Sequence, residues 1–207
     1  MTRIKICGLR RKEDIEFANR LLPEYAGFVF ADSTRQVTGA QAQQLRLQLD
    51  LRISAVGVFV QEEIGFIKQL AAARIIDMVQ LHGDESPEYC REVRRQVKLP
   101  IIKVLRVRDA ASLAVAADYD CDYLLLDTYT KTAYGGSGQR FSIELLREAS
   151  LPKPYFIAGG LNAENVQSVL VAAPYAIDVS GGVETEGRKD FEKMQAFVAN
   201  VKGSKAK

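Results

Sequence analysis

A cysteine close to the start of the chain is the first candidate for chemistry. Cys7 ends the segment Ile4-Lys5-Ile6-Cys7 and is followed by Gly8. Side chains alternate along a strand, so Cys7 shares a face with Lys5. Parallel α/β folds place their chemistry at the carboxyl ends of strands, and the reactive form of a cysteine is its thiolate. The competing interpretation is a small buried hydrophobic residue, because free cysteines are among the most buried residue types.

A carboxyl group ends another apolar strand. In Tyr123-Leu124-Leu125-Leu126-Asp127 the alternation places Asp127 on the face shared by Tyr123 and Leu125. Apolar surroundings and a nearby thiolate both raise the pKa of a carboxyl group and help it to keep its proton. Asp127 is therefore a candidate general acid. A loop aspartate or a helix cap remains the alternative.

Glycines follow two of the later strand candidates. Gly159-Gly160 follows one, and Ser180-Gly181-Gly182 follows the next. In a barrel these are the two loops that often hold a phosphate through backbone N–H groups, since glycine permits close approach of the backbone. Asp178 shares a face with Ser180, and we expect it to point inward and accept hydrogen bonds from sugar hydroxyls. Ordinary tight turns and a structural aspartate are the alternatives.

Two further polar side chains sit in loops. Arg35 lies in the segment Asp32-Ser33-Thr34-Arg35-Gln36, where a guanidinium is suited to hold a substrate carboxylate with two hydrogen bonds, unless it is simply a solvated loop residue. His82 is the only histidine and is too isolated for a metal site, so we expect it to line or cap the end of a strand and expect no metal. The glycines of residues 135–138 do not form a P-loop and are interpreted as a mobile lid.

Composition excludes several classes of partner. The 207 residues are 47% hydrophobic, and 28 basic against 26 acidic residues give a net charge of +2, which indicates no nucleic-acid partner. The start of the chain does not read as a signal peptide and no apolar run is long enough to span a membrane, so we expect a cytoplasmic protein without a membrane partner. The three cysteines have no metal-type spacing and fit free thiols. The oligomeric state is not readable.

The elements that must position these residues alternate along the chain. A single domain over residues 1–207 is expected, a (β/α)₈ barrel of near-minimal size with residues 203–207 as a frayed tail, because eight strand-then-helix units occur without a dividing linker. A doubly wound open sheet is the competitor, since it uses the same alternation. The expected strands are residues 4–7, 25–30, 53–60, 78–81, 101–104, 123–126, 155–158 and 176–179. The expected helices are residues 11–22, 41–49, 62–73, 110–117, 143–148 and 191–201, with further helices beginning near Ser86-Pro87 and at Asn162 as an N-cap.

With these residues in view, the chain resembles the phosphoribosylanthranilate isomerase family of tryptophan biosynthesis. The matching segments occur in order and run nearly end to end, which makes them specific together although each is weak alone. They are residues 5–9, 27–30 with Ser33 and Arg35, 56–60, 79–85, 124–127, 135–138, 158–161 and 178–184. The family usually has a second serine where Gly181 stands, a departure that touches neither Cys7 nor Asp127.

The resemblance implies an aldose–ketose isomerase, that is, an intramolecular oxidoreductase that works by general acid–base catalysis. Its reaction is the Amadori rearrangement of N-(5-phosphoribosyl)anthranilate to 1-(2-carboxyphenylamino)-1-deoxyribulose 5-phosphate, without metal or organic cofactor. The resemblance assigns the general base to Cys7 and the general acid to Asp127. It places Arg35 near the anthranilate carboxylate and the loops of Gly159-Gly160 and Ser180-Gly181-Gly182 around the phosphate.

Two other functions remain open at this stage. A different sugar-phosphate barrel enzyme, of the indole-glycerol-phosphate synthase or Schiff-base aldolase type, would use Lys5 or Lys103 as a buried lysine with a lowered pKa. A non-catalytic sugar-phosphate binder would keep the glycine loops and need neither Cys7 nor Asp127. The sequence suggests two groups that would lower the thiol pKa of Cys7, namely Arg10 or the positive end of a following helix.

Overall fold

Eight parallel strands form a closed ring in the computed structural model, which describes residues 1–109, 111–127 and 151–203. The strands pair in chain order, and the first also pairs with the last. This closure confirms the predicted barrel and excludes the open doubly wound sheet, whose two edge strands stay unpaired. The strands are β1 (Arg3–Cys7), β2 (Tyr25–Val29), β3 (Ser54–Phe59), β4 (Met78–Leu81), β5 (Ile101–Arg106), β6 (Tyr123–Asp127), β7 (Tyr155–Ala158) and β8 (Ala176–Val179).

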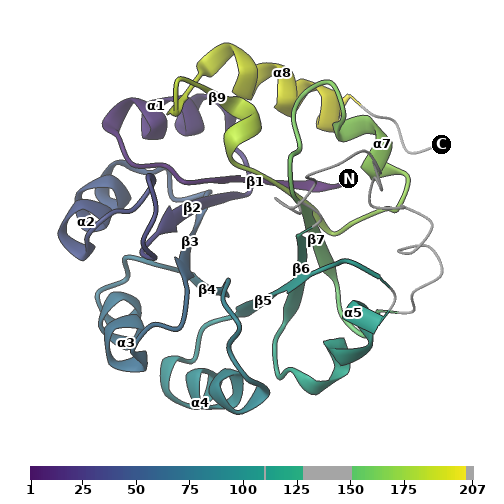
Figure 1. Ribbon diagram of the computed structural model, residues 1–207. Coiled ribbons are helices and arrows are strands. Elements are labelled where there is room, and N and C mark those ends of the chain that lie inside the picture. The colour runs from purple at the N-terminus through teal and green to yellow at the C-terminus, as the bar shows by residue number, and fades with distance from the viewer. Residues whose placement is uncertain (110, 128–150, 204–207) are drawn as a thin grey trace.

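The helices lie around the outside of this ring (Figure 1). They are α1 (Lys12–Leu21), α2 (Gly39–Gln48), α3 (Ile64–Ala72), α4 (Pro87–Val97), α5 (Ala111–Ala114), α7 (Val166–Leu170) and α8 (Phe191–Lys202), with 3₁₀ turns η1 (Val115–Asp118) and η2 (Gly181–Val183). The expected helix at 143–148, the 135–138 loop and residues 204–207 of the expected tail lie outside the described residues. The extent of one domain over all of residues 1–207 stays a prediction.

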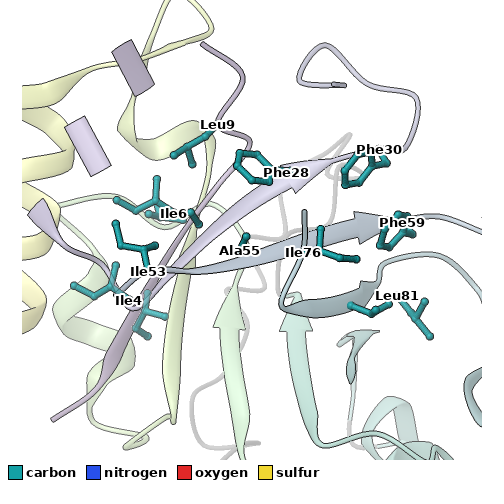
Figure 2. Packing of buried hydrophobic residues seen from close by; sticks show 14 of the residues in the cluster. Ile4, Ile6, Leu9, Phe28, Phe30, Ile53, Ala55, Phe59, Ile76 and Leu81 are labelled. Atoms are coloured by element: carbon teal, nitrogen blue, oxygen red, sulfur yellow. The ribbon is translucent and has the colours of Figure 1, made fainter. Parts of the chain in front are cut away.

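The strands separate two apolar layers. Ile4 and Ile6 of β1 point outward and pack in the large cluster between strands and helices (Figure 2). A second, smaller cluster is built from residues of the opposite phase, such as Leu125 and Phe156, and fills the interior of the ring. Lys5 and Cys7 share this inner phase, as the alternation predicts.

Capping explains where the predicted helix boundaries differ from the observed ones. The Thr38 side chain accepts a hydrogen bond from the N–H of Gln41 in a capping box, so α2 begins at Gly39, two residues before the predicted start. Ser86 caps α4 and Pro87 follows at the first helical position, as predicted. The helix expected at 110–117 is shorter, because α5 passes into the 3₁₀ turn η1.

The prediction of Asn162 as the N-cap of a helix is wrong. Helix α7 begins at Val166 and its N-cap is Asn165. The Asn162 side chain instead accepts hydrogen bonds from the N–H groups of Glu164 and Asn165, at 2.9 and 3.0 Å, and so closes a turn ahead of the helix. Asn165 in turn donates to the carbonyl of Gly160 at 2.9 Å, which fixes the loop that leaves β7.

A short hairpin follows β8 that the sequence patterns did not predict. Its strands β9 (Glu184–Thr185) and β10 (Arg188–Lys189) pair antiparallel, with Lys189 opposite Glu184. Two residues are too few to show a period of two, so no pattern could reveal these strands. The hairpin places Glu184 beside Arg35, and it brings Lys189 close enough to Cys7 to lower the pKa of its thiol.

A buried ion pair connects the ends of β3, β4 and β5. Lys103 Nζ lies 2.6 Å from Glu85 Oε2 and 2.7 Å from the carbonyl oxygen of Gly83. The other carboxylate oxygen of Glu85 accepts from the N–H groups of Gly83 and Gln61. Burial by itself raises the pKa of Glu85, but the hydrogen bonds from Lys103 and Gln61 outweigh it, and the pKa of this carboxyl is lowered. The Glu85 carboxylate is therefore charged at neutral pH, and Lys103 is its buried partner.

Replacing Lys103 with methionine is expected to destabilise the protein by about 3 to 5 kcal/mol at pH 7, because it leaves the Glu85 carboxylate buried without its cation. A carboxyl with a depressed folded-state pKa contributes stability above its unfolded pKa, about 4.3, and loses it as the pH falls through the folded value. The difference between variant and wild type should therefore shrink in acid. Urea unfolding at pH 7 and at about pH 3 measures it.

The exposed Lys68 of α3 gives the matched control, and its replacement by methionine should change stability by less than about 0.5 kcal/mol. A Lys103→Met variant as stable as wild type at pH 7 would show that this ion pair does not brace the loops.

Candidate active site

One cavity of about 690 Å³ opens at the carboxyl ends of the barrel strands. All nine predicted site residues line it, although they come from β1, β6, β8 and the segments after β2, β7 and β8. They are Cys7, Arg35, Asp127, Gly159, Gly160, Asp178, Ser180, Gly181 and Gly182. The structure therefore brings the whole predicted set together, with the thiol and the carboxyl at the same end of the ring.

Charged groups surround the thiol of Cys7 at the end of β1. Burial raises the pKa of this thiol and Asp178 raises it further, whereas the ammonium groups of Lys5 and Lys189 lower it. Burial dominates in this set, and the pKa lies above its ordinary value. The nearby cations are thus the groups that favour the thiolate. Arg10, which the sequence offered for this role, instead donates hydrogen bonds to the carbonyl oxygens of Thr34 and Gly187.

Lys5 is fully buried and pairs across the strand boundary with Asp178. Its Nζ lies 2.9 Å from Asp178 Oδ1, in accordance with the register that sets these two residues side by side on β1 and β8. The pKa of Lys5 is raised, since the attraction of Asp178 and Cys7 outweighs the opposing effect of burial. A Schiff-base lysine needs a lowered pKa, so Lys5 does not fit that role. Lys103, the other candidate, lies outside the lining of this cavity in its pair with Glu85.

His82 directly follows β4 and lines the cavity near Asp127. Its Nε2 is 3.8 Å from Asp127 Oδ2, and its Nδ1 is 2.8 Å from the Gln80 amide nitrogen. Burial lowers the pKa of His82, while Asp127 raises it less, so the imidazole is neutral at pH 7. With Gln80 donating to Nδ1, the ring proton is on Nε2 and faces Asp127. The prediction that His82 lines a strand end is confirmed, and its approach to Asp127 is new.

Arg35 reaches the cavity from the loop after β2. Its Nε and Nη2 donate to the two carboxylate oxygens of Glu184, at 2.8 and 2.6 Å. A Cβ atom on Gly8 would lie 2.5 Å from Arg35 Cδ, so only glycine at this position leaves room for the arginine stem. The sequence identified Arg35 but not its partner, because a glutamate on an unrecognised hairpin carries no local signal.

The two glycine loops touch each other at their backbones. A Cβ atom on Gly182 would lie 1.8 Å from the carbonyl oxygen of Leu161, so the loops after β7 and β8 can approach this closely only with glycine there. The Ser180 hydroxyl donates to the Cys7 carbonyl at 3.1 Å and ties the second loop to β1. Gly181 and Gly182 themselves belong to the 3₁₀ turn η2, and barrels often present backbone N–H groups to a phosphate from loops and short helices at this place.

The described residues contain neither a candidate metal site nor a candidate membrane-spanning helix. Within residues 1–109, 111–127 and 151–203, no cluster of histidine, cysteine, aspartate and glutamate is arranged to hold a metal ion. In the same part of the chain no helix has both the length and the apolar character needed to cross a bilayer.

Comparisons with known proteins agree along nearly the whole chain. The family model described as N-(5'-phosphoribosyl)anthranilate (PRA) isomerase matches residues 4–200. An N-(5'-phosphoribosyl)anthranilate isomerase of Thermoanaerobacter sp. is 44% identical over 204 residues, which are 98% of this chain and 99% of the relative.

Solved structures give the same result. The phosphoribosyl anthranilate isomerase of Thermotoga maritima is 37% identical with a TM-score of 0.88, over 99% of this chain and all of the other. A phosphoribosyl anthranilate isomerase solved with reduced 1-(o-carboxyphenylamino)-1-deoxyribulose 5-phosphate is 34% identical with a TM-score of 0.86, over 99% of this chain and 100% of the other.

Proposed function

The chain belongs to the N-(5'-phosphoribosyl)anthranilate isomerase family, and from that premise we propose that it carries out the family reaction with Cys7 as general base and Asp127 as general acid. The reaction converts N-(5-phosphoribosyl)anthranilate into 1-(2-carboxyphenylamino)-1-deoxyribulose 5-phosphate, a step of tryptophan biosynthesis. The observation that carries this assignment of roles is the single cavity lined by both groups, by Arg35 and by the two glycine loops.

The furanose ring opens first. Protonated Asp127 donates its proton to the ring oxygen as the C1–O bond breaks, and the lone pair of the nitrogen forms the C1=N bond of an iminium ion. The iminium acidifies the proton on C2. The Cys7 thiolate removes that proton, and its electron pair forms the C1=C2 bond of an enolamine. Tautomerisation of the enolamine moves a proton from the 2-hydroxyl to C1 and yields the ketone.

The remaining lining residues hold the substrate between these two groups. We propose that Arg35 binds the anthranilate carboxylate, that Gly159, Gly160, Ser180, Gly181 and Gly182 surround the phosphate, and that Asp178 accepts a hydrogen bond from a sugar hydroxyl while it pairs with Lys5. Fixing both ends places C2 and the ring oxygen near their partners, and such positioning is worth several kcal/mol of barrier. The ligand is thus a small phosphorylated aminosugar, and we expect the protein to act in the cytoplasm.

Fluorescence tests the activity directly. The anthranilate moiety of the substrate emits light, so we expect its emission to decay when the purified protein is added and to persist without it. A non-catalytic binder would change the emission once and then hold it constant. An absence of turnover in the wild-type protein would contradict the proposed function.

Replacing Arg35 with alanine is expected to raise KM by about ten- to a hundredfold, the equivalent of a lost charge-assisted contact, and to lower kcat much less. The reason is that the carboxylate forms and breaks no bond in the reaction and is held equally in the ground and transition states. Initial rates over a range of substrate concentrations measure both constants. Arg91→Ala, on the exposed face of α4, is the control, and an unchanged KM for Arg35→Ala would remove the residue from binding.

A further inference from the structure

Glu184 holds the guanidinium of Arg35 along one edge. Arg35 Nε donates to Glu184 Oε1 at 2.8 Å and Nη2 donates to Oε2 at 2.6 Å, a bidentate pair. The glutamate side chain is 6% exposed, whereas that of Arg35 is 31% exposed and lines the cavity. The buried carboxylate therefore lies behind the arginine, and the cavity lies in front of it.

The geometry of a guanidinium leaves a second edge for a ligand. Its five N–H groups form a rigid planar fork, and the bonds to Glu184 use Nε and one hydrogen of Nη2. The edge formed by Nη1 and the other hydrogen of Nη2 is not taken by Glu184. A carboxylate ligand can bind there in a bidentate manner without displacing the glutamate.

Neighbouring backbone confines the arginine further. The Cβ position of Gly8 lies 2.5 Å from Arg35 Cδ, and that of Gly181 lies 3.4 Å from Arg35 Nη2. The stem therefore passes over Gly8 and the head lies against Gly181. Arginine loses much conformational freedom when it is ordered, and this slot together with Glu184 removes that freedom before a ligand arrives.

Lys189 fixes the glutamate in turn. Its Nζ lies 2.7 Å from Glu184 Oε1 and 3.0 Å from the carbonyl oxygen of Ser180, and the two residues face each other across the β9–β10 hairpin. Burial opposes ionisation of Glu184, but the hydrogen bonds from Arg35 and Lys189 prevail and lower the pKa of Glu184 to about 2. The carboxylate is thus charged at neutral pH and is tied to the loop that follows β8.

We propose that Glu184 is a positioning residue that sets the free edge of Arg35 for the carboxylate of the substrate, with Lys189 anchoring Glu184 to the Ser180 loop. This inference rests on the proposed function, because it presumes that Arg35 receives a carboxylate. The β9–β10 hairpin would thus connect the two ends of the ligand site. Its Glu184 holds Arg35 for the substrate carboxylate, and its Lys189 contacts the Ser180 carbonyl in the loop proposed to bind the phosphate.

A pair of stable ligands isolates this role from turnover. The first is reduced 1-(o-carboxyphenylamino)-1-deoxyribulose 5-phosphate, and the second is the same compound built on aniline, without the carboxyl group. Isothermal titration calorimetry gives Kd for each with wild type, Glu184→Gln and the control Glu186→Gln, which removes the same charge from the exposed turn of the same hairpin.

We expect Glu184→Gln to weaken binding of the carboxylated ligand by about tenfold, the effect of one lost charge-assisted hydrogen bond, and to leave binding of the aniline compound within about twofold. Glu186→Gln should bind both as wild type does. In the Arg35→Ala background the Glu184→Gln change should add nothing to the loss, because its effect passes through the arginine.

Three results would overturn the inference. They are equal binding of the carboxylated ligand by Glu184→Gln and wild type, an equal loss for both ligands, or additive losses in the double variant. The second would mean that Glu184 only supports the hairpin, and the aniline compound detects misfolding in the same titration. Failure of the proposed function has a different signature, since wild type would then neither turn over the substrate nor prefer the carboxylated ligand.

Discussion

Asp127→Asn is expected to lower kcat by about 10²- to 10⁴-fold, the usual contribution of a general acid. The amide keeps the size and shape of the carboxyl group, but its N–H protons are far too weakly acidic to be transferred to the ring oxygen as the C1–O bond breaks. Asp127 ends β6 on the inner face of the barrel and faces His82 Nε2 at 3.8 Å. Substrate binding should persist, since Arg35 and the glycine loops remain in place.

Single-turnover fluorescence separates these steps, with the reduced product analogue as the probe of binding. Asp84→Asn is the matched control, because this aspartate is exposed at the end of β4, pairs with Arg106 and lies outside the cavity lining. Turnover by Asp127→Asn within about tenfold of wild type would exclude Asp127 as the general acid.

Cys7→Ser is the second substitution for which we expect a large effect, also a loss of about 10²- to 10⁴-fold in kcat. A hydroxyl group ionises far less readily than a thiol, so the serine is a poor acceptor for the C2 proton. Lys5 and Lys189, which favour the thiolate in the wild type, cannot compensate for this difference. The cavity changes little in volume, and binding of the reduced product analogue should be retained.

Exchange of the C2 proton with solvent provides a direct readout. In deuterated substrate the variant should fail to release the label, whereas wild type releases it during turnover. Cys121→Ala is the control, since Cys121 is buried in the outer core and does not line the cavity. Retained turnover and label release by Cys7→Ser would assign the base to another group.

Local patterns were sufficient for much of the fold. Strand alternation placed Cys7 opposite Ile6 and Asp127 with Leu125, and the structure agrees because a period of two is a property of any extended chain. The eight strand–helix units predicted a barrel, and the pairing of β1 with β8 confirmed it. Boundaries were less accurate where a side chain beyond the apolar run decides the first turn, as Thr38 does for α2.

Contacts between distant segments were not predictable in the same way. Arg10 was one of two groups that the sequence offered for lowering the thiol pKa of Cys7, the other being the positive end of a following helix. Arg10 instead bonds to carbonyls of other loops, and the cations that lower this pKa are Lys5 and Lys189. Lys189 comes from a hairpin of two-residue strands that leaves no trace in the sequence pattern. The pairing of Arg35 with Glu184 joins residues 149 positions apart, and neither member indicates the other.

The sequence alone determined the residue types at the strand ends, the face of the strand on which each side chain lies, and the family resemblance that implies their roles. It could do so because alternation and motif order are local properties of a chain. Only the tertiary structure decided which of those strand ends share one cavity, that Lys5 forms an ion pair with Asp178, and that Glu184 pairs with Arg35. The physical reason is that closing the barrel sets the register between strands, and register determines which charges become neighbours when water is excluded.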